Sequence, residues 1–231
     1  MAYEYQFDRE KCWYKDTCPH YKNDEICHAG CIRYMEMHFL MNNSGIPKNR
    51  QYPVALSAIK KDLAAYMRLK EIKDHIVEFV SSGSNLYIYS DNFGNGKTTW
   101  SIKLMQQFFD QIWAGNGFRC RGIFIHVPTF LTKIKENISV RDEDFELLRK
   151  RLLIVDLVIW DDIAATKLGD YDHANLLTYV DQRKLQGLSN IYTGNLGSSE
   201  LPAALGNRLT SRVWNDSEQI YFSAADWRGI K

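Results

Sequence analysis

The chain has 231 residues, 45% of them hydrophobic and 25% charged, which is typical of a soluble globular protein. The formal net charge of +1 excludes a strong overall attraction to nucleic acid or membranes, so any basic binding surface must be local. The first residues lack the basic and apolar regions of a signal peptide. The longest apolar stretch, residues 152–160, is short and contains Asp156, so we expect no membrane-spanning segment.

The N-terminal region is rich in cysteine. Four of the chain's five cysteines fall close together, at Cys12, Cys18, Cys27 and Cys31. Four thiolates can close a tetrahedral Zn²⁺ site, and so short a segment needs such a cross-link to fold. An iron–sulfur cluster is the main alternative metal centre, and four unpaired thiols are the alternative without metal. His20 or His28 could replace one sulfur, although each is more often exposed to solvent.

A helix over residues 32–40 and a break at residues 42–47 follow, so we place a domain boundary near residue 50. This divides the chain into a zinc-binding module, residues 1–50, and a second domain, residues 51–231. Residues 48–73 carry seven basic and two acidic side chains, a local balance of 7 − 2 = +5. This stretch could contact a nucleic-acid backbone, or it could be a solvated helix face. The apolar residues at helical spacing predict the buried face of a helix: Leu56, Ile59, Leu63, Tyr66 and Met67. A second helix is predicted over residues 72–80.

Residues 86–90 predict a strand, a glycine-containing loop follows, and residues 98–113 predict a helix. This strand–loop–helix order is that of a phosphate-binding P-loop. Lys97 would reach the β- and γ-phosphates, and the Thr98 hydroxyl would ligate Mg²⁺. The predicted nucleotide contacts are Asn92, Phe93, Gly94, Asn95, Gly96, Lys97, Thr98 and Thr99. Asp91 stands where the first glycine of the motif belongs, a departure that affects the start of the loop rather than the phosphate cradle.

Further along, residues 122–127 predict a strand, and two helices are predicted from Pro128 and over residues 142–151. Residues 157–160 then predict a buried parallel strand that ends in Asp161 and Asp162. Ligands of open α/β sheets bind at the carboxyl ends of the strands. Asp161 would hold Mg²⁺ and Asp162 would orient or deprotonate the attacking water. Together with Lys97, this pair of acidic residues indicates an NTPase.

The last third of the chain predicts a helix over residues 171–186, a strand over 189–193, a helix over 202–214 and a strand over 219–222. Asn195 follows the first of these strands. It would lie between the two motifs and contact the γ-phosphate or its water, or it is an ordinary turn residue. Arg208 and Arg212 are spaced i, i+4 and therefore share one helix face.

These motifs occur in the order seen in AAA+ ATPases, and Thr193-Gly-Asn195, Asn207 to Arg212 and Trp227-Arg228 complete the likeness. The chain resembles most the DnaC/DnaI/IstB group, whose replication members load the replicative helicase onto DNA. The resemblance covers residues 50–231 and implies an α/β AAA+ P-loop NTPase with a central parallel sheet flanked by helices. The cysteine block followed by Ser44-Gly-Ile-Pro47 is similar to phage-type DnaC-like proteins of Gram-positive hosts and to zinc-bearing loader N-termini.

The resemblance also implies roles for individual residues. Lys97, Thr98, Asp161 and Asp162 match the phosphate, magnesium and hydrolysis positions. Asn195 matches sensor 1, Arg212 matches an arginine finger that acts in trans with Arg208 as second choice, and Arg228 matches sensor 2. Most AAA+ proteins carry glutamate where Asp162 stands, so slow hydrolysis is expected. The chain ends soon after Arg228, so we expect the lid domain to be absent or vestigial.

From this resemblance we expect a cytoplasmic helicase loader of replication initiation that uses ATP, Mg²⁺ and Zn²⁺ and contacts no membrane. Its expected partners are the hexameric replicative helicase, single-stranded DNA and further copies of itself, bound through the ATP site. Related loaders carry a DNA-contacting helical insertion where Lys133, Lys135 and Arg141 stand. The alternatives are an IstB-like transposition helper, a small-molecule kinase, and a nucleotide-gated adaptor with little turnover.

Overall fold

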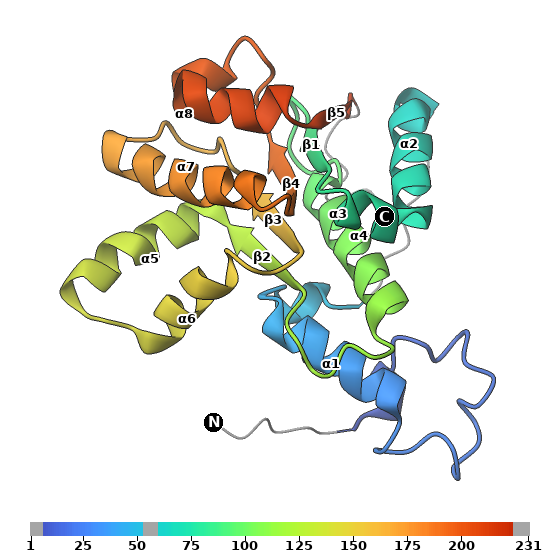
Figure 1. The fold of residues 1–231 in the computed structure, drawn as a ribbon. Coiled ribbons are helices and arrows are strands. Elements are labelled where there is room, and N and C mark those ends of the chain that lie inside the picture. Colours follow the sequence, from blue (N-terminus) through green and yellow to red (C-terminus); the bar gives the residue numbers. More distant parts are fainter. Residues whose placement is uncertain (1–6, 53–59, 224–231) are drawn as a thin grey trace.

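The computed structural model describes residues 7–52 and 60–223 (Figure 1). Within them, one sheet of five parallel strands has the order β2-β3-β4-β1-β5. The strands are β1 (Asn85–Tyr89), β2 (Gly122–His126), β3 (Leu157–Asp161), β4 (Ser189–Gly194) and β5 (Glu218–Tyr221). The three inner strands are almost wholly buried, as a parallel sheet covered on both faces requires.

Helices cover both faces of this sheet (Figure 1). One group comprises α1 (Ile32–Asn43), α2 (Leu63–Asp74), α3 (Ile76–Ser81) and α4 (Lys97–Ile112). The other comprises α5 (Val127–Ser139), α6 (Glu143–Arg151), α7 (Asp170–Leu185) and α8 (Leu201–Thr210), which continues into a π-helical turn, Ser211–Asn215. Short 3-10 turns lie at Arg9–Lys11, Lys48–Arg50 and Lys60–Asp62.

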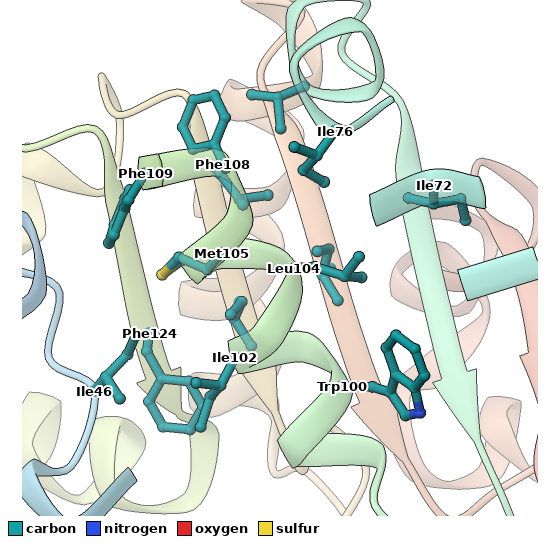
Figure 2. Close-up of a cluster of buried hydrophobic side chains, with 14 of the residues drawn as sticks. Ile46, Ile72, Ile76, Trp100, Ile102, Leu104, Met105, Phe108, Phe109 and Phe124 are labelled. Carbon is teal, nitrogen blue, oxygen red and sulfur yellow. The ribbon is translucent and has the colours of Figure 1, made fainter. Parts of the chain in front are cut away.

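The alternation of side chains along each strand divides the core in two. In β3, Leu157 and Ile159 join the hydrophobic cluster of α1 to α4, whereas Val158 and Trp160 join the cluster of α5 to α8. Figure 2 shows the first cluster, in which Met105 and Phe109 of α4 lie toward the sheet. Helix α4 therefore packs along the sheet with its N-terminus at the carboxyl ends of the strands.

The structure confirms the predicted strands and most helices to within a few residues, and it corrects three details. The helix predicted over residues 72–80 is broken at His75, between α2 and α3. The helix predicted over residues 202–214 is kinked at Gly206 and ends in the π-helical turn. The predicted buried face of α2 is wrong for Leu63 and Met67, which are 51% and 56% exposed, because Leu69 and Ile72 make the contact with the core. Leu56 and Ile59 lie outside the described residues.

The segment before residue 52 packs against the same core as α4. Tyr14 and the α1 residues Met37, Leu40 and Met41 belong to the hydrophobic cluster that contains α4. Arg33 Nη2 also lies 2.9 Å from Asp110 Oδ1 of α4. The division into residues 1–50 and 51–231 stays a prediction, but the two parts share one hydrophobic cluster.

Candidate nucleotide site

A cavity of about 560 Å³ opens at the carboxyl ends of the strands. It is lined by the P-loop residues 93–99, by the strand-end residues His126, Asp161, Asp162 and Asn195, and by Pro47, Asn49, Arg50 and Phe124. Gly96 caps α4 with φ +92°, a left-handed conformation that a glycine adopts without strain. The N-terminus of a sixteen-residue helix therefore faces the cavity, where its free N–H groups and dipole favour an anion.

The P-loop lysine lies folded back onto its own loop. Lys97 is 7% exposed, and its Nζ donates to the Asn92 carbonyl at 2.9 Å and to Asn95 Oδ1 at 3.2 Å. Asn95 in turn donates from Nδ2 to Ser90 Oγ. Asn92 is the one predicted nucleotide contact that does not line the cavity among the described residues. Asp91, at the departure from the motif, accepts a hydrogen bond from the Tyr221 hydroxyl of β5 at 2.8 Å.

Two hydroxyls converge on the first acidic residue of β3. Thr98 Oγ1 donates to Asp161 Oδ1 at 2.8 Å, and Thr193 Oγ1 donates to the same oxygen at 2.7 Å. Burial raises the pKa of Asp161, and the hydrogen bonds from Thr193 and Thr98 partly oppose this shift. A hydroxyl and a carboxylate side by side are hard oxygen donors of the kind that Mg²⁺ prefers. The structure therefore brings together the two residues predicted to hold magnesium.

The second acidic residue has an unusual backbone. Asp162 has φ +57°, which is rare outside glycine, and its N–H donates to Thr193 Oγ1 at 3.0 Å. Its Oδ2 lies 3.8 Å from His126 Nε2, and the other ring nitrogen of His126 lies 2.8 Å from Thr129 Oγ1. No site role was predicted for His126, or for Thr193 within the Thr193-Gly-Asn195 motif. Each stands at the carboxyl end of a strand, and this position is the signal that could have indicated them.

Asn195 lies where the strand order places it, after β4 and between the ends of β1 and β3. Its Oδ1 is buried and finds no hydrogen-bond partner within the described part of the chain. An unpaired buried amide oxygen is costly, so a ligand or water in the cavity would satisfy it.

The two arginines of the α8 region lie away from the cavity. Arg212 Nε lies 2.6 Å from Asp181 Oδ1, and its Nη1 lies 3.3 Å from Asp216 Oδ2. The hydrogen bond that Arg212 donates to Asp181 is the main cause of a raised pKa for Arg212. Arg208 Nη2 lies 2.9 Å from the other oxygen of Asp181. Both arginines thus bind one aspartate of α7. Arg228 lies outside the described residues.

The four N-terminal cysteines are partly buried free thiols. Burial is the main cause of a raised pKa for Cys12, and the other three cysteines raise it further. In residues 7–52 and 60–223, however, no group of three or more His, Cys, Asp or Glu side chains is close enough to hold a metal ion. The structure does not form the predicted zinc site, and zinc binding stays a prediction.

Several residues of the basic segments are already ion-paired. Lys135 Nζ lies 2.7 Å from Asp172 Oδ2, whereas Lys133 lies in the middle of α5 and Arg141 lies in the turn between α5 and α6. In the stretch 48–73, Arg68 pairs with Glu218 and Glu71, each at 2.6 Å. Within the part of the chain that the structure describes, no helix is both long and apolar enough to cross a membrane.

No protein-family profile matches the sequence, and no curated protein matches it. Solved structures do match. The DnaC helicase loader aligns with a TM-score of 0.60 and 17% identity over 79% of this chain and 98% of that one. DnaI aligns with a TM-score of 0.57 and 15% identity over 78% of this chain and 92% of that one. AMPPCP-bound DnaA from Aquifex aeolicus aligns with a TM-score of 0.57 and 18% identity over 73% of this chain and 48% of that one.

The five-stranded parallel sheet, the helices on both faces and these alignments define a P-loop NTPase fold of the AAA+ type. More particularly, the chain has the fold of the DnaC-like helicase loaders, and its likeness extends over nearly the whole DnaC structure. At such low identities the likeness establishes the fold.

Proposed function

We propose that this protein is an ATP-dependent helicase loader that acts in the initiation of DNA replication. The observation that carries the proposal is the group formed by Thr98, Asp161 and Thr193, which joins the P-loop to the end of β3 inside a cavity of about 560 Å³. A hydroxyl and a carboxylate held next to a P-loop lysine are the parts that MgATP requires. The DnaC helicase loader and DnaI share the fold.

In this proposal each residue has a defined role. Lys97 exchanges its contacts with Asn92 and Asn95 for the β- and γ-phosphates, and residues 93–99 surround the phosphate chain with backbone N–H groups. Thr98 and Asp161 hold Mg²⁺, which neutralises charge on the phosphates. Asp162 orients the attacking water. Asn195 lines the same cavity, with an oxygen available to accept a hydrogen bond. Because aspartate is one methylene shorter than glutamate, turnover is slow.

The partners follow from the same proposal. Single-stranded DNA binds the α5–α6 hairpin, where Lys133 and Arg141 lie, and the replicative helicase binds the N-terminal segment. Copies of the chain associate through the ATP site in the cytoplasm. The four cysteines, Cys12, Cys18, Cys27 and Cys31, bind one Zn²⁺ after rearrangement of their loop. Metal analysis of the purified protein, compared with a variant in which two of these cysteines are serine, tests that step.

The deciding experiment measures ATP binding, ATP hydrolysis and helicase loading for the parent and two variants. Lys97→Ala should lose ATP binding because it removes the phosphate-binding cation. Asp162→Asn should bind ATP normally and hydrolyse it at least about ten-fold more slowly, because an amide cannot take the proton of the water. Loading of a hexameric helicase onto single-stranded DNA should occur only when the protein is bound to ATP. An Asp162→Asn variant as active as the parent would show that another residue positions the water.

A further inference from the structure

The N-terminal segment supplies one wall of the nucleotide cavity. Pro47, Asn49 and Arg50 line it together with the P-loop, although they precede Lys97 by more than forty residues in the sequence. No motif in this segment indicates a nucleotide contact. The fold, rather than a sequence motif, brings these residues to the cavity, and their side chains determine what this wall can bind.

The backbone of this wall is firmly held. Gln106 of α4 donates from Nε2 to the carbonyl oxygens of Arg50, at 3.3 Å, and Gln51, at 3.1 Å. The buried Gln51 side chain donates to the carbonyls of Met41 and Ile46. On the other side, Phe124 N of β2 donates to the Ser44 carbonyl at 2.6 Å. The turn Lys48–Arg50 is thus anchored to the P-loop helix, and the residues just before it are anchored to the edge strand.

Arg50 stands out on this wall. Its side chain is exposed and makes no ion pair or hydrogen bond within the described part of the chain, although its carbonyl is held by Gln106. Gln106 and Thr99 are seven residues apart on α4, which is two helical turns or about 10 Å along one face. Arg50 therefore lies beside the middle of α4, and it lines the same cavity as the first turn of that helix.

The chemistry of a guanidinium at this place is specific. A planar guanidinium binds phosphate oxygens through two parallel N–H groups, and it is always charged. We propose that Arg50 binds the phosphates of the nucleoside triphosphate in the same chain, as a second cation beside Lys97. This inference rests on the proposed ATP site. It adds a phosphate ligand from outside the P-loop and makes the N-terminal segment part of that site.

The neighbouring lysine offers a matched control. Lys48 belongs to the same 3-10 turn, but it lines a different cavity, of about 750 Å³, together with Trp13, Tyr34 and Tyr52. Both residues are exposed and basic, so removal of either changes the net charge equally. If only the overall charge of the turn matters, the two alanine variants will behave alike. If Arg50 contacts phosphate, only its own variant will lose affinity.

The test is the affinity of the full chain for AMPPCP and ADP, measured by calorimetry with Mg²⁺, for the parent and for Arg50→Ala, Arg50→Lys, Lys48→Ala and Lys97→Ala. Arg50→Ala should bind about ten-fold more weakly, because a charge-assisted hydrogen bond is lost. Arg50→Lys should recover part of the affinity, and the affinity of Lys48→Ala should stay within about two-fold of the parent. The same thermal midpoint for Arg50→Ala and the parent would exclude misfolding.

The outcomes separate the two proposals. If Lys97→Ala does not bind nucleotide but Arg50→Ala binds both nucleotides with the parental affinity, the proposed role of Arg50 is overturned and the proposed ATP site stands. Equal losses in Arg50→Ala and Lys48→Ala would overturn it too, since they indicate a general charge effect. A parent that binds neither nucleotide would refute the proposed function itself.

Discussion

At the scale of single residues, Asp161 combines structural and functional demands that oppose each other. The residue is 5% exposed, and its carboxylate accepts hydrogen bonds from Thr98 and Thr193. Burial nevertheless raises its pKa above the ordinary value of 3.8. The folded state therefore holds the proton more strongly than the unfolded state does. As pH rises through these pKa values the folded protein loses stability, and the full loss is present at neutral pH.

Asp161→Asn should consequently stabilise the nucleotide-free protein at neutral pH. The amide oxygen can still accept the two hydroxyl hydrogen bonds, and no charge has to be buried. We expect a gain on the order of 1 kcal/mol, or about 2–4 °C in the thermal midpoint, together with loss of Mg²⁺-dependent ATP binding. Melting curves at pH 7 and pH 4 test this, because the gain should shrink at the lower pH. A variant less stable than the parent at both pH values would contradict the argument.

The residues that sequence reasoning identified share one property: each belongs to a short motif. Lys97 and Thr98 belong to the P-loop pattern, and Asp161 belongs to the apolar strand that ends in two acidic residues. The structure brings these three residues together. His126 and Arg50 belong to no such motif, and their proximity to the cavity depends on which strands are neighbours and on where residues 44–51 lie relative to the sheet. A single sequence predicts that parallel strands share a carboxyl edge, but it does not give the spatial order of those strands.

At the scale of secondary-structure elements, the junction of β1 and α4 depends on Gly96. Its φ of +92° lies in the left-handed region, and an added Cβ would meet no atom within 4 Å. The cost of a side chain there is backbone strain rather than a clash. Two helices were predicted well for different reasons: α4 carries a regular stripe of apolar residues, and α6 begins at Asp142, whose side chain caps its first turn. Helices were predicted poorly where packing changed direction, at His75 and at Gly206.

Gly96→Ala should lower the free energy of unfolding by about 1 kcal/mol, the usual cost of a left-handed alanine. It should also weaken ATP binding, because relief of the strain moves the N–H groups of the loop. Gly169→Ala is the matched control: Gly169 precedes α7 with φ −77°, and an added Cβ again meets nothing within 4 Å. Chemical denaturation and nucleotide titration of both variants provide the comparison. Similar behaviour of the two variants would mean that the loop tolerates the substitution by moving elsewhere.

At the scale of the whole molecule, the proposed assembly gives Arg212 two roles. Within one chain it pairs with Asp181 and Asp216, which ties the π-helical turn to α7. In an oligomer, an arginine that reaches the next subunit's γ-phosphate would stabilise the charge on the transferring phosphoryl group. This would increase the rate of hydrolysis by on the order of 10³-fold or more. Arg208 shares Asp181 but is 68% exposed, so it is the more accessible of the two.

Mixing experiments distinguish these arginines. Arg212→Ala protein should bind ATP through an intact Lys97 but hydrolyse it poorly, and Lys97→Ala protein should lack a working site. If Arg212 acts in trans, a mixture should regain activity that neither variant has alone. The same mixture made with Arg208→Ala identifies the finger if Arg212 fails. No recovery in either mixture, with co-assembly verified, would restrict both arginines to holding α8 on α7.

The position of residues 43–46 has a further consequence, for aggregation. β2 lies at one end of the sheet order, and an edge strand with unpaired backbone groups is a template on which another chain can add a strand. Here Ser44 accepts a hydrogen bond from Phe124 N, and Cys120 Sγ lies 3.6 Å from the Asn43 carbonyl. Gly45 makes this approach possible, because its φ is +75° and a Cβ would lie 2.9 Å from the Phe124 carbonyl oxygen. The N-terminal segment therefore also protects an edge that would otherwise invite β-sheet growth between molecules.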